Sequence, residues 1–379
     1  MRLEVRDFAH IKHADVEFGD LTALVGPQAA GKSLLLQLWK LALDWDEVVR
    51  SLRATGYPLT NRQQLLDAYF GEGMRTAWRR TTRVRINGEP FDPARRLREN
   101  QRRRAAKVFF VPAHRALLVS EGWPLPFDRL KADTPAVARL FSQSLYERFT
   151  GAEAGDLFPV ERTLKRDVRA LIDAAVFHGG KVRLQQPGLQ KRLELRHGAT
   201  ELPFMTWTAG QREFTPLLLG LYKVLPPRMQ RKDPSIDWVI IEEPEMGLHP
   251  QAISAVMALV LELLWRGYRV VLSTHAPLIL DVIFAMQVLR GSKAGHRRLQ
   301  QAFGLGDSQN TLGMLKAALA KSTKTYALGF DALGRTSTTD ISTLDPGSDE
   351  PTVADWGGLT GFSSRFGAAI ARAVAEGDA

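Results

Sequence analysis

One segment near the amino terminus has the composition of a phosphate-binding loop. Residues 26–33, GPQAAGKS, match the pattern G-x-x-x-x-G-K-[ST], whose glycines let backbone N–H groups surround phosphate oxygens. The apolar run LTALV precedes the loop and the helix-like run LLLQLWKLALDW follows it, a context that a chance glycine-rich turn would lack. The residues predicted to bind a nucleotide here are Gly26, Pro27, Gln28, Ala29, Ala30, Gly31, Lys32, Ser33 and Leu34.

Two side chains of this loop have predicted chemical roles. Lys32 would reach the β- and γ-phosphates and stabilise the charge that develops during phosphoryl transfer. The Ser33 hydroxyl would bind Mg²⁺. The sequence therefore predicts ATP and Mg²⁺ as the cofactors, with Lys32 as a catalytic residue and Ser33 as a metal ligand.

A pair of carboxylates follows a second apolar run. In WVIIEE, four apolar residues lead into Glu242 and Glu243 at a strand end, where ligands of a parallel sheet collect. Glu242 would act on Mg²⁺, directly or through water, and Glu243 would orient or deprotonate the attacking water. The alternative is an acidic cap on a strand, which the phosphate loop makes the weaker interpretation.

Two further segments place polar groups at element ends. His275 follows the apolar strand expected at 268–273. Its ring could donate to a γ-phosphate oxygen, although a lone histidine is more often structural. The second segment begins an apolar helix, where small residues can form an anion site, although by itself it is better explained by ordinary helix capping. This second segment comprises Thr208, Ala209, Gly210 and Gln211.

The order of these runs predicts an α/β fold. The segments 238–241 and 268–273 are expected strands on either side of a helix over 250–265, which implies a parallel sheet with crossover connections. Further strands are expected at 21–25 and 108–111. We expect a parallel or mixed sheet whose strand ends bring Glu242, Glu243 and His275 to the phosphate loop.

Taken together, these elements resemble the ABC-type ATPases, a class that includes transporter ATPases, the SMC family, RecF-like repair proteins and the OLD (overcoming lysogenization defect) family. The order of phosphate loop, TAGQ, acidic strand end and histidine is the same. The run EEPEMGLHP, residues 242–250, looks specifically like that of OLD-type ATPases, as does STHAP at 273–277. The resemblance implies an ABC-type ATPase core with a mostly helical insertion lobe.

The sequence departs from the ABC pattern at three places. TAGQ stands where the signature has Ser-Gly-Gly-Gln, so the Cβ of Ala209 lies at an expected phosphate contact. The usual Q-loop glutamine is not evident, and His114 or Arg115 occupies the matching strand end. No DxD motif of a Toprim nuclease follows His275, so the chain looks like the ATPase half alone.

The resemblance also implies partners. Two copies would sandwich two ATP molecules head to tail, with the phosphate loop of one copy facing Thr208–Gln211 of the other, in a dimer or a larger even assembly. ATP binding would close this dimer and hydrolysis would reopen it. OLD-like ATPases often accompany a separate effector, such as a nuclease, in anti-phage defence, so we expect a switch or sensor that controls an effector.

Charge and composition narrow the alternatives. The absence of cysteine excludes disulfides, zinc–thiolate sites and a cysteine nucleophile. The net charge of +10 is concentrated in Arg75–Lys107, which holds twelve Lys/Arg and three Asp/Glu and is either a nucleic-acid contact or a solvated surface. The first option supports a RecF/SMC-like DNA-binding ATPase of DNA repair. The ATPase subunit of a membrane transporter is a third reading, which the OLD-like run disfavours.

The predicted organisation has three parts. Residues 1–115 and 205–341 would form the ATPase core, with a basic insertion at about 50–107, and residues 116–204 would form the insertion lobe. Residues 342–379 would be a tail, with a flexible linker at 344–355, and the segment around Trp356 is either a docking peptide or a turn that closes the core. No apolar stretch reaches membrane-spanning length and no signal peptide is evident, so we expect a cytoplasmic protein without a membrane partner.

Overall fold

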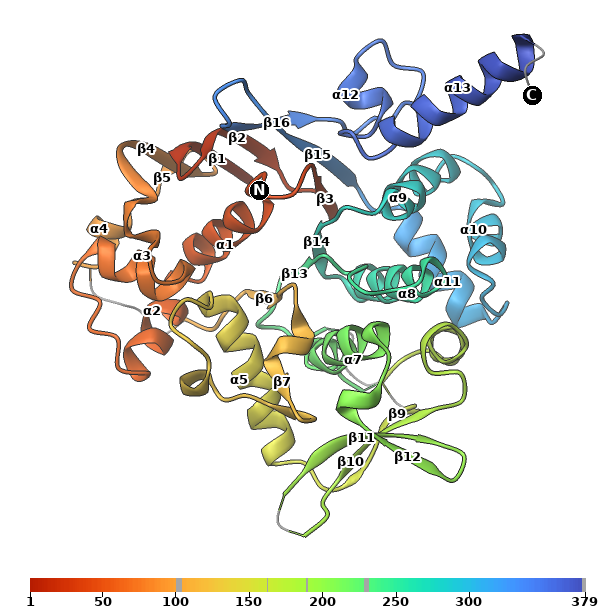
Figure 1. Cartoon of the computed structure of the whole chain (residues 1–379), viewed down its shortest axis with the longest axis horizontal. Helices are drawn as coiled ribbons and strands as arrows, with labels where there is room; N and C mark the ends of the chain where they lie inside the picture. The colour runs from red at the N-terminus through yellow and green to blue at the C-terminus, as the bar shows by residue number, and fades with distance from the viewer. Residues whose placement is uncertain (100–103, 162, 189, 228–231, 377–379) are drawn as a thin grey trace.

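A ten-stranded mixed sheet forms the centre of the computed structural model, which describes residues 1–99, 104–161, 163–188, 190–227 and 232–376 (Figure 1). The strand order is β5-β4-β1-β2-β16-β15-β3-β14-β13-β6. This confirms the predicted α/β class. The bounds are β1 Arg2–Phe8, β2 Ile11–Glu17, β3 Leu21–Val25, β4 Trp78–Ile86, β5 Glu89–Pro90, β6 Val108–Val111, β13 Trp238–Glu242, β14 Arg269–Ser273, β15 Thr323–Phe330 and β16 Thr336–Asp340.

The parallel strands β3, β14, β13 and β6 set the position of the site. Every residue of β3 and β13 is buried, because helices cover both faces of this part of the sheet. The register pairs Leu24 with Ser273 and Ser273 with Glu242, so the carboxyl ends of β3, β14 and β13 lie side by side. The loops that follow these strands therefore emerge at one edge.

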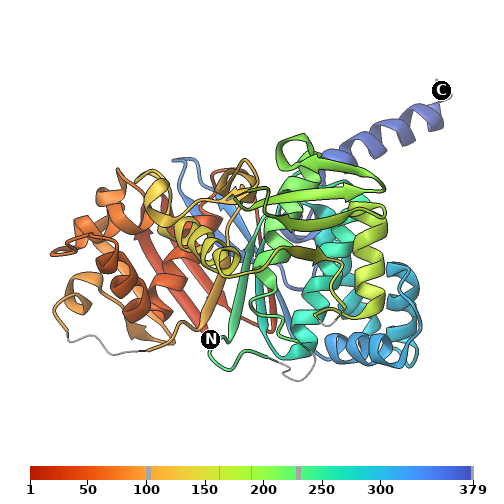
Figure 2. The ribbon, with the colours of Figure 1, turned by 90° about the horizontal axis from the view of Figure 1, so that it is seen from below.

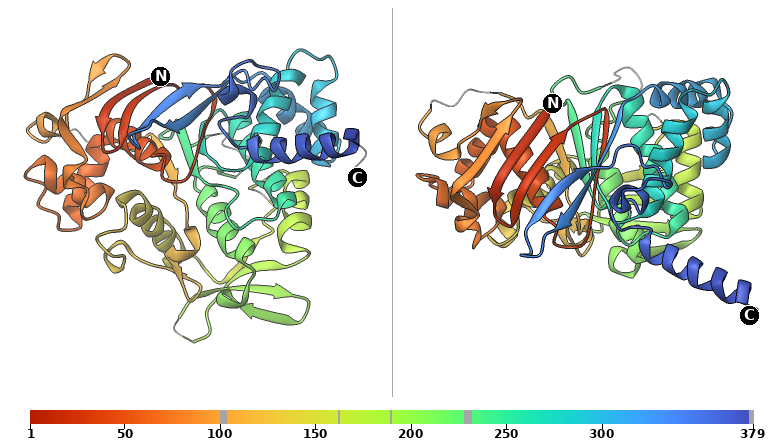
Figure 3. Two further views of the ribbon diagram at one scale, coloured as in Figure 1. Left: turned by 45° about the horizontal axis from the view of Figure 1, so that its top comes forward. Right: turned by 90° about the horizontal axis from the view of Figure 1, so that it is seen from above.

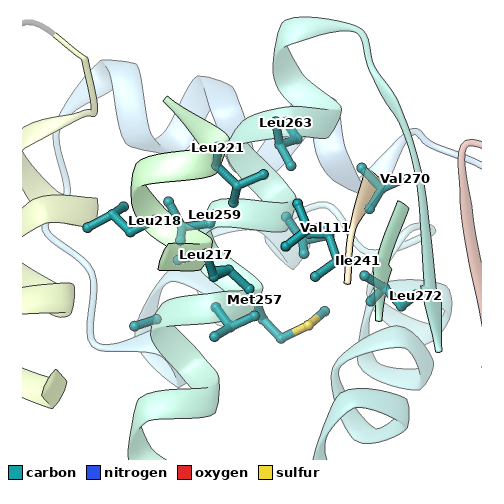
Figure 4. Packing of buried hydrophobic residues seen from close by; sticks show 14 of the residues in the cluster. Val111, Leu217, Leu218, Leu221, Ile241, Met257, Leu259, Leu263, Val270 and Leu272 are labelled. Carbon is teal, nitrogen blue, oxygen red and sulfur yellow. The ribbon is translucent and has the colours of Figure 1, made fainter. Parts of the chain in front are cut away.

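Helices lie on both faces of the central strands of the sheet (Figures 1 and 2). On one face, α1–α3 share a hydrophobic cluster with Leu24, Val108 and Ile240. On the other face, α7 and α8 pack against alternate residues of the same strands, including Val111, Ile241 and Leu272 (Figure 4). The bounds of the helices around the sheet are α1 Lys32–Leu43, α2 Trp45–Ala54, α3 Arg62–Phe70, α4 Pro93–Arg96, α7 Ala209–Leu221, α8 Pro250–Arg266, α9 Pro277–Leu289, α10 Gly295–Phe303 and α11 Gln309–Leu319.

The segment 116–204 contains more β-structure than the sequence predicted. A four-stranded antiparallel sheet, in the order β12-β11-β10-β9, accompanies its helices, whereas the sequence indicated only the hairpin of the two middle strands. The outer strands are four residues long, too short to show a clear alternation. The bounds are η2 Arg115–Leu118, β7 Val119–Ser120, β8 Trp123–Pro124, α5 Ala136–Thr150, β9 Gly155–Phe158, α6 Arg166–Ile172, the π-helix Asp173–Phe177, β10 Lys181–Gln185, β11 Arg192–His197, β12 Thr200–Pro203 and η5 Phe204–Thr206.

The segment 344–355 is packed against the core, contrary to the predicted flexible linker. Leu344 and Trp356 are buried, and the Trp356 indole Nε1 donates to the Leu344 carbonyl at 3.0 Å. Gly357 lies against Val25 and Ala327, where a Cβ would come within 3.0 Å of both side chains. The prediction failed because the apolar contacts of this polar-looking stretch come from distant strands. The tail contains the short helix α12 Pro351–Ala354 and α13 Gly361–Glu376, which projects from the body (Figure 3).

None of the helices in the described ranges is long and apolar enough to cross a membrane. The basic stretch is divided by the structure. Its first part forms β4, its middle part forms α4, and residues 100–103 lie outside the described residues.

Candidate nucleotide-binding site

The segment Gly26–Ser33 connects β3 to α1 and curls around the first turn of that helix. Gly26 has φ +138°, and a Cβ there would lie 2.3 Å from the Leu328 carbonyl oxygen, so only glycine fits. Gly31 caps α1 at φ +89°, and a Cβ there would lie 2.8 Å from the His10 Nε2 atom. The loop is therefore held in shape by β15 and by the turn between β1 and β2.

Lys32 lies folded over this loop. Its Nζ donates to the Gly26 carbonyl at 2.8 Å and to the Pro27 carbonyl at 3.0 Å, and only 5% of the residue is exposed. Burial lowers the pKa of the Lys32 ammonium to about 8, and the carboxylates of Glu243 and Glu245 act in the opposite direction. A phosphate in the loop would supply the negative charge that this buried cation lacks.

Glu242 ends β13 as a buried carboxyl. Burial raises the pKa of Glu242 to about 7, while the Ser33 hydroxyl and the Ala113 amide lower it. Its Oε2 accepts from the Ala113 N–H at 3.3 Å, and its Oε1 is buried without a partner among the described residues. An unsatisfied buried carboxylate oxygen beside a hydroxyl is a vacant ligand position.

Those two groups fit the predicted metal. Mg²⁺ is commonly held by one or two protein oxygens together with substrate phosphates. In the described ranges no group of three or more His, Asp or Glu side chains could hold a metal by itself. Ser33 and Glu242 would therefore hold Mg²⁺ jointly with the nucleotide, as the sequence predicted, and this assignment stays a prediction.

Glu243 and His275 meet across the edge of the sheet. Glu243 Oε1 lies 3.5 Å from His275 Nε2, and both side chains are about 30% exposed. Glu243 has φ +41°, a conformation that residues other than glycine rarely adopt, and its N–H donates to the Ser273 carbonyl at 2.9 Å. The two side chains predicted to act on water and on the γ-phosphate thus converge from β13 and β14.

A residue outside the predicted set, Glu245, joins the two loops. Its Oε1 accepts from the Thr274 hydroxyl at 2.8 Å and from the His275 N–H at 2.6 Å. The carboxylate therefore fixes the backbone of His275 relative to Glu243. The sequence places Glu245 in the OLD-like run, but only the register of β13 against β14 shows what it touches.

Arg115, one candidate to replace the Q-loop glutamine, has a structural position instead. Its guanidinium is fully buried and donates to the carbonyls of Glu242 at 2.8 Å, of Pro112 at 3.0 Å and of Glu243 at 3.2 Å. Burial lowers the pKa of Arg115, and the surrounding glutamates oppose that shift. Arg115 thus positions the acidic strand end, whereas the neighbouring His114 is exposed.

The segment Thr208–Gln211 is not brought to the phosphate loop of the same chain. The Thr208 hydroxyl accepts from the Gln211 N–H at 3.3 Å and the Gln211 carbonyl oxygen of the side chain accepts from the Thr208 N–H at 3.2 Å, which closes a capping box on α7. A hollow of about 410 Å³ beside it is lined by Gly247, Leu248 and His249, and by no residue of the loop Gly26–Ser33. In the segment Thr208–Gln211, Thr208 and Ala209 are exposed to solvent.

Comparison with known proteins gives two matches at the level of sequence. Residues 126–281 match the family model described as "AAA domain, putative AbiEii toxin, Type IV TA system". The OLD nuclease of Thermus scotoductus (strain ATCC 700910 / SA-01) is 25% identical over 323 residues, which cover 74% of this chain and 60% of that relative. The match thus spans less than two thirds of the relative's length.

The chain is similar to the ABC-type P-loop ATPases of the OLD and SMC-like group. Two solved structures resemble this chain over 89% of its length. One is an SMC head bound to the C-winged helix domain of ScpA, with 11% identity, 96% of that chain covered and a TM-score of 0.43. The other is the SMC head domain from Thermotoga maritima, with 13% identity, 97% of that chain covered and a TM-score of 0.37.

Proposed function

We propose that the chain binds and hydrolyses ATP and acts as a dimerising switch that controls a separate effector, a nuclease, in bacterial anti-phage defence. The observation that carries the ATPase is the convergence of Lys32, Glu242, Glu243 and His275 from three neighbouring strands. Lys32 and the loop amides would hold the phosphates. Water would attack the γ-phosphorus while Glu243 accepts its proton and the bond to ADP breaks.

His275 and Mg²⁺ complete the proposed reaction. His275 would donate to a γ-phosphate oxygen, and the 3.5 Å approach of its ring to Glu243 would link the presence of that phosphate to the catalytic carboxylate. Mg²⁺, when bound, would neutralise negative charge on the phosphates. Loss of the γ-phosphate would free His275, so ATP and ADP would favour different arrangements of this edge.

The dimer is supported by the separation of two binding surfaces. The phosphate loop and Thr208–Gln211 do not share a hollow within one chain, and the latter segment is open to solvent. In a head-to-tail pair, each copy would present its α7 terminus, a favourable place for an anion, to the nucleotide of the other. The names of the similar proteins, a nuclease and a putative toxin of a type IV TA system, support an effector partner.

The test compares ATP turnover and solution mass for the native chain and Glu243→Gln. Glutamine cannot accept the proton, so we expect turnover to fall roughly 10²–10⁴-fold. ATP binding should persist, and the variant should accumulate as an ATP-dependent dimer or larger even assembly. Turnover that survives in Glu243→Gln would remove the proposed base, and a mass that ignores ATP in both chains would remove the switch.

A second candidate function, nucleic-acid binding, is favoured by the exposed face of β4 and β1. Arg6 pairs with Arg83 across the two strands, and both side chains are exposed. Like charges directly opposite each other destabilise a sheet, and neither arginine has an acidic partner in the described part of the chain. A phosphate backbone would supply the missing charge.

This candidate is tested by titrating duplex DNA at two salt concentrations with ATP present. Arg83→Ala should weaken binding and reduce the salt dependence by about one phosphate contact. Arg95→Ala is the matched control, because Arg95 is also exposed but already pairs with Glu99 at 3.2 Å. Equal DNA binding by the native chain and by Arg83→Ala would show that this face does not contact the DNA.

A further inference from the structure

The helix α13 presents an apolar row that nothing in its own chain covers. Sixteen residues long, it has no buried side chain in the described structure. Its large apolar residues are between 57% and 65% exposed and recur every four positions, at Phe362, Phe366, Ile370 and Val374. This spacing follows one ridge of the helix surface, the type of ridge that packs against another element at a crossing angle.

The root of α13 lies beside the phosphate loop. Gly357 lies against Ala327 of β15 and against Val25, the residue that precedes Gly26, and the neighbouring Trp356 donates to the Leu344 carbonyl. The opposite ends of β13 and β14 lie near Met1, with which Trp238 and Arg269 line a hollow. Figure 2 shows α13 extending away from the N label, on the side of the carboxyl ends of these strands. The helix therefore extends on the side where a second copy would meet the nucleotide.

A hollow with both apolar and polar walls lies in the same chain. It measures about 820 Å³, and its lining combines Trp123, Tyr146 and Met205 with charged side chains such as Lys191. Met205 is 58% exposed and lies three residues before Thr208. We call this the lobe hollow. It adjoins the segment that the proposed dimer brings to the partner's phosphate loop.

Geometry separates these two surfaces within one chain. In Figures 1 and 3, α13 and the sheet β10–β12 lie at different ends of the molecule, so α13 does not fill the lobe hollow of its own chain. A head-to-tail two-fold would bring the surroundings of one phosphate loop to the surroundings of the other copy's Thr208. In a symmetric pair this contact occurs twice.

We propose that α13 of one copy docks in the lobe hollow of a second copy, seating Phe362 and Phe366 there and clasping the ATP-dependent dimer. This rests on the head-to-tail dimer proposed above. A membrane surface fits less well, because such helices are rich in Lys and Arg and the polar side of α13 offers only Arg365 and Arg372. The clasp would make the tail a determinant of how long the dimer lasts.

Because the chain has no cysteine, introduced cysteine pairs report this contact without background. Two differently tagged populations in the Glu243→Gln background, one with Phe366→Cys and the other with Met205→Cys, are mixed with ATP and oxidised mildly. We expect a disulfide between the two tagged chains with ATP and little without it. Ser364→Cys, on the opposite side of α13, is the matched control and should link poorly to Met205→Cys.

The outcomes separate the clasp from the switch. If an ATP-dependent dimer forms but yields no disulfide between positions 366 and 205, the proposed docking of α13 is wrong and the switch remains. The same conclusion follows if the disulfide joins position 366 of one copy to position 366 of the other. A Phe366→Cys thiol that stays fully reactive in the dimer also overturns the clasp and assigns the helix to another partner. A mass that ignores ATP overturns both proposals.

A second variant measures the contribution of the row. Phe366→Ser should raise the dissociation constant of the ATP dimer at least about tenfold, because a buried aromatic anchor is lost. Leu333→Ser, which removes another exposed apolar residue, from the turn between β15 and β16, should leave this dissociation constant unchanged. Equal dimer stability for the two variants would contradict the clasp.

Discussion

The acidic edge of β13 and the start of α7 differ in how far one chain completes them. At the acidic edge, two side chains form hydrogen bonds to the backbone. Arg115 donates to the Glu242 carbonyl at the strand end, and Glu245 accepts from the N–H of His275. At the second, Thr208 and Gln211 satisfy each other and leave the small residues facing water. The comparison teaches that one chain already organises the proposed catalytic groups, whereas it leaves Thr208 and Ala209 exposed, as the proposed dimer requires.

Removing Arg115 should break the first region most severely. Arg115→Met would leave the carbonyls of Glu242, Glu243 and Pro112 without their buried donor and would remove the cation opposite Glu213, 3.8 Å away. Losing one member of such a buried network costs about 3–5 kcal/mol. We expect the free energy of unfolding to fall by that amount, measured by urea denaturation.

The matched control for this variant is Arg79→Met on the exposed face of β4. A surface substitution of this kind changes stability by no more than about 0.5 kcal/mol. Equal stability of the two variants would show that the acidic edge does not depend on the buried guanidinium.

Glu245→Ala tests the link between the two catalytic loops. The change removes the carboxylate oxygen that accepts from the Thr274 hydroxyl and from the His275 N–H, and it leaves the side chains of Lys32 and Glu243 in place. Because His275 would lose its fixed position rather than its ring, we expect turnover to fall roughly 10–100-fold with little change in KM. Steady-state kinetics measures both quantities. A rise in KM at unchanged kcat would place Glu245 in ATP binding instead.

These two residues also show what sequence could and could not reveal. The strands β3 and β13 were predicted at nearly their observed bounds, because burial on both faces produces continuous apolar runs. The partners of Glu245 lie 29 and 30 positions away, and pairing of β13 with β14 brings them together. Motif spacing therefore located the site, and only tertiary register located its supports.

The same reasoning explains the remaining differences. Trp356 packs because its indole N–H reaches the Leu344 carbonyl and its ring lies against Phe284, and the composition of 344–355 indicates neither contact. The outer strands of the β9–β12 sheet are short and carry glycine or proline. Local periodicity is weak in such segments, whereas it is strong in the buried centre.

The pH dependence of nucleotide affinity sharpens the comparison, because burial brings the pKa values of both Lys32 and Glu242 close to neutrality. Burial lowers the pKa of Lys32 to about 8, so above that pH binding must take up a proton and affinity falls up to about tenfold per pH unit. Burial raises the pKa of Glu242 to about 7, so below that pH the Mg²⁺ ligand must lose a proton. Affinity for Mg²⁺–ATP should peak between about pH 7 and 8.

Calorimetry across pH measures this profile, and two controls separate its limbs. With EDTA in place of Mg²⁺, only the alkaline decline should remain. Glu242→Gln should likewise flatten the part of the acid limb that comes from the protein, and any acid decline left in this variant belongs to the nucleotide. An alkaline limb that is absent in the native chain would show that Lys32 does not respond to the phosphate charge.

The smallest expected effect concerns the start of α7, and a comparison of two helix caps measures it. Thr208 caps α7 and Ser308 caps α11, each accepting a backbone N–H at 3.3 Å. Thr208→Ala and Ser308→Ala should each lower the free energy of unfolding by about 1 kcal/mol. If Thr208 also meets the nucleotide of a second copy, only Thr208→Ala should reduce turnover, roughly 3–10-fold, and only at protein concentrations where the dimer forms. Equal turnover in the two variants would leave Thr208 with capping as its whole role, and would move the partner contact elsewhere on the signature segment.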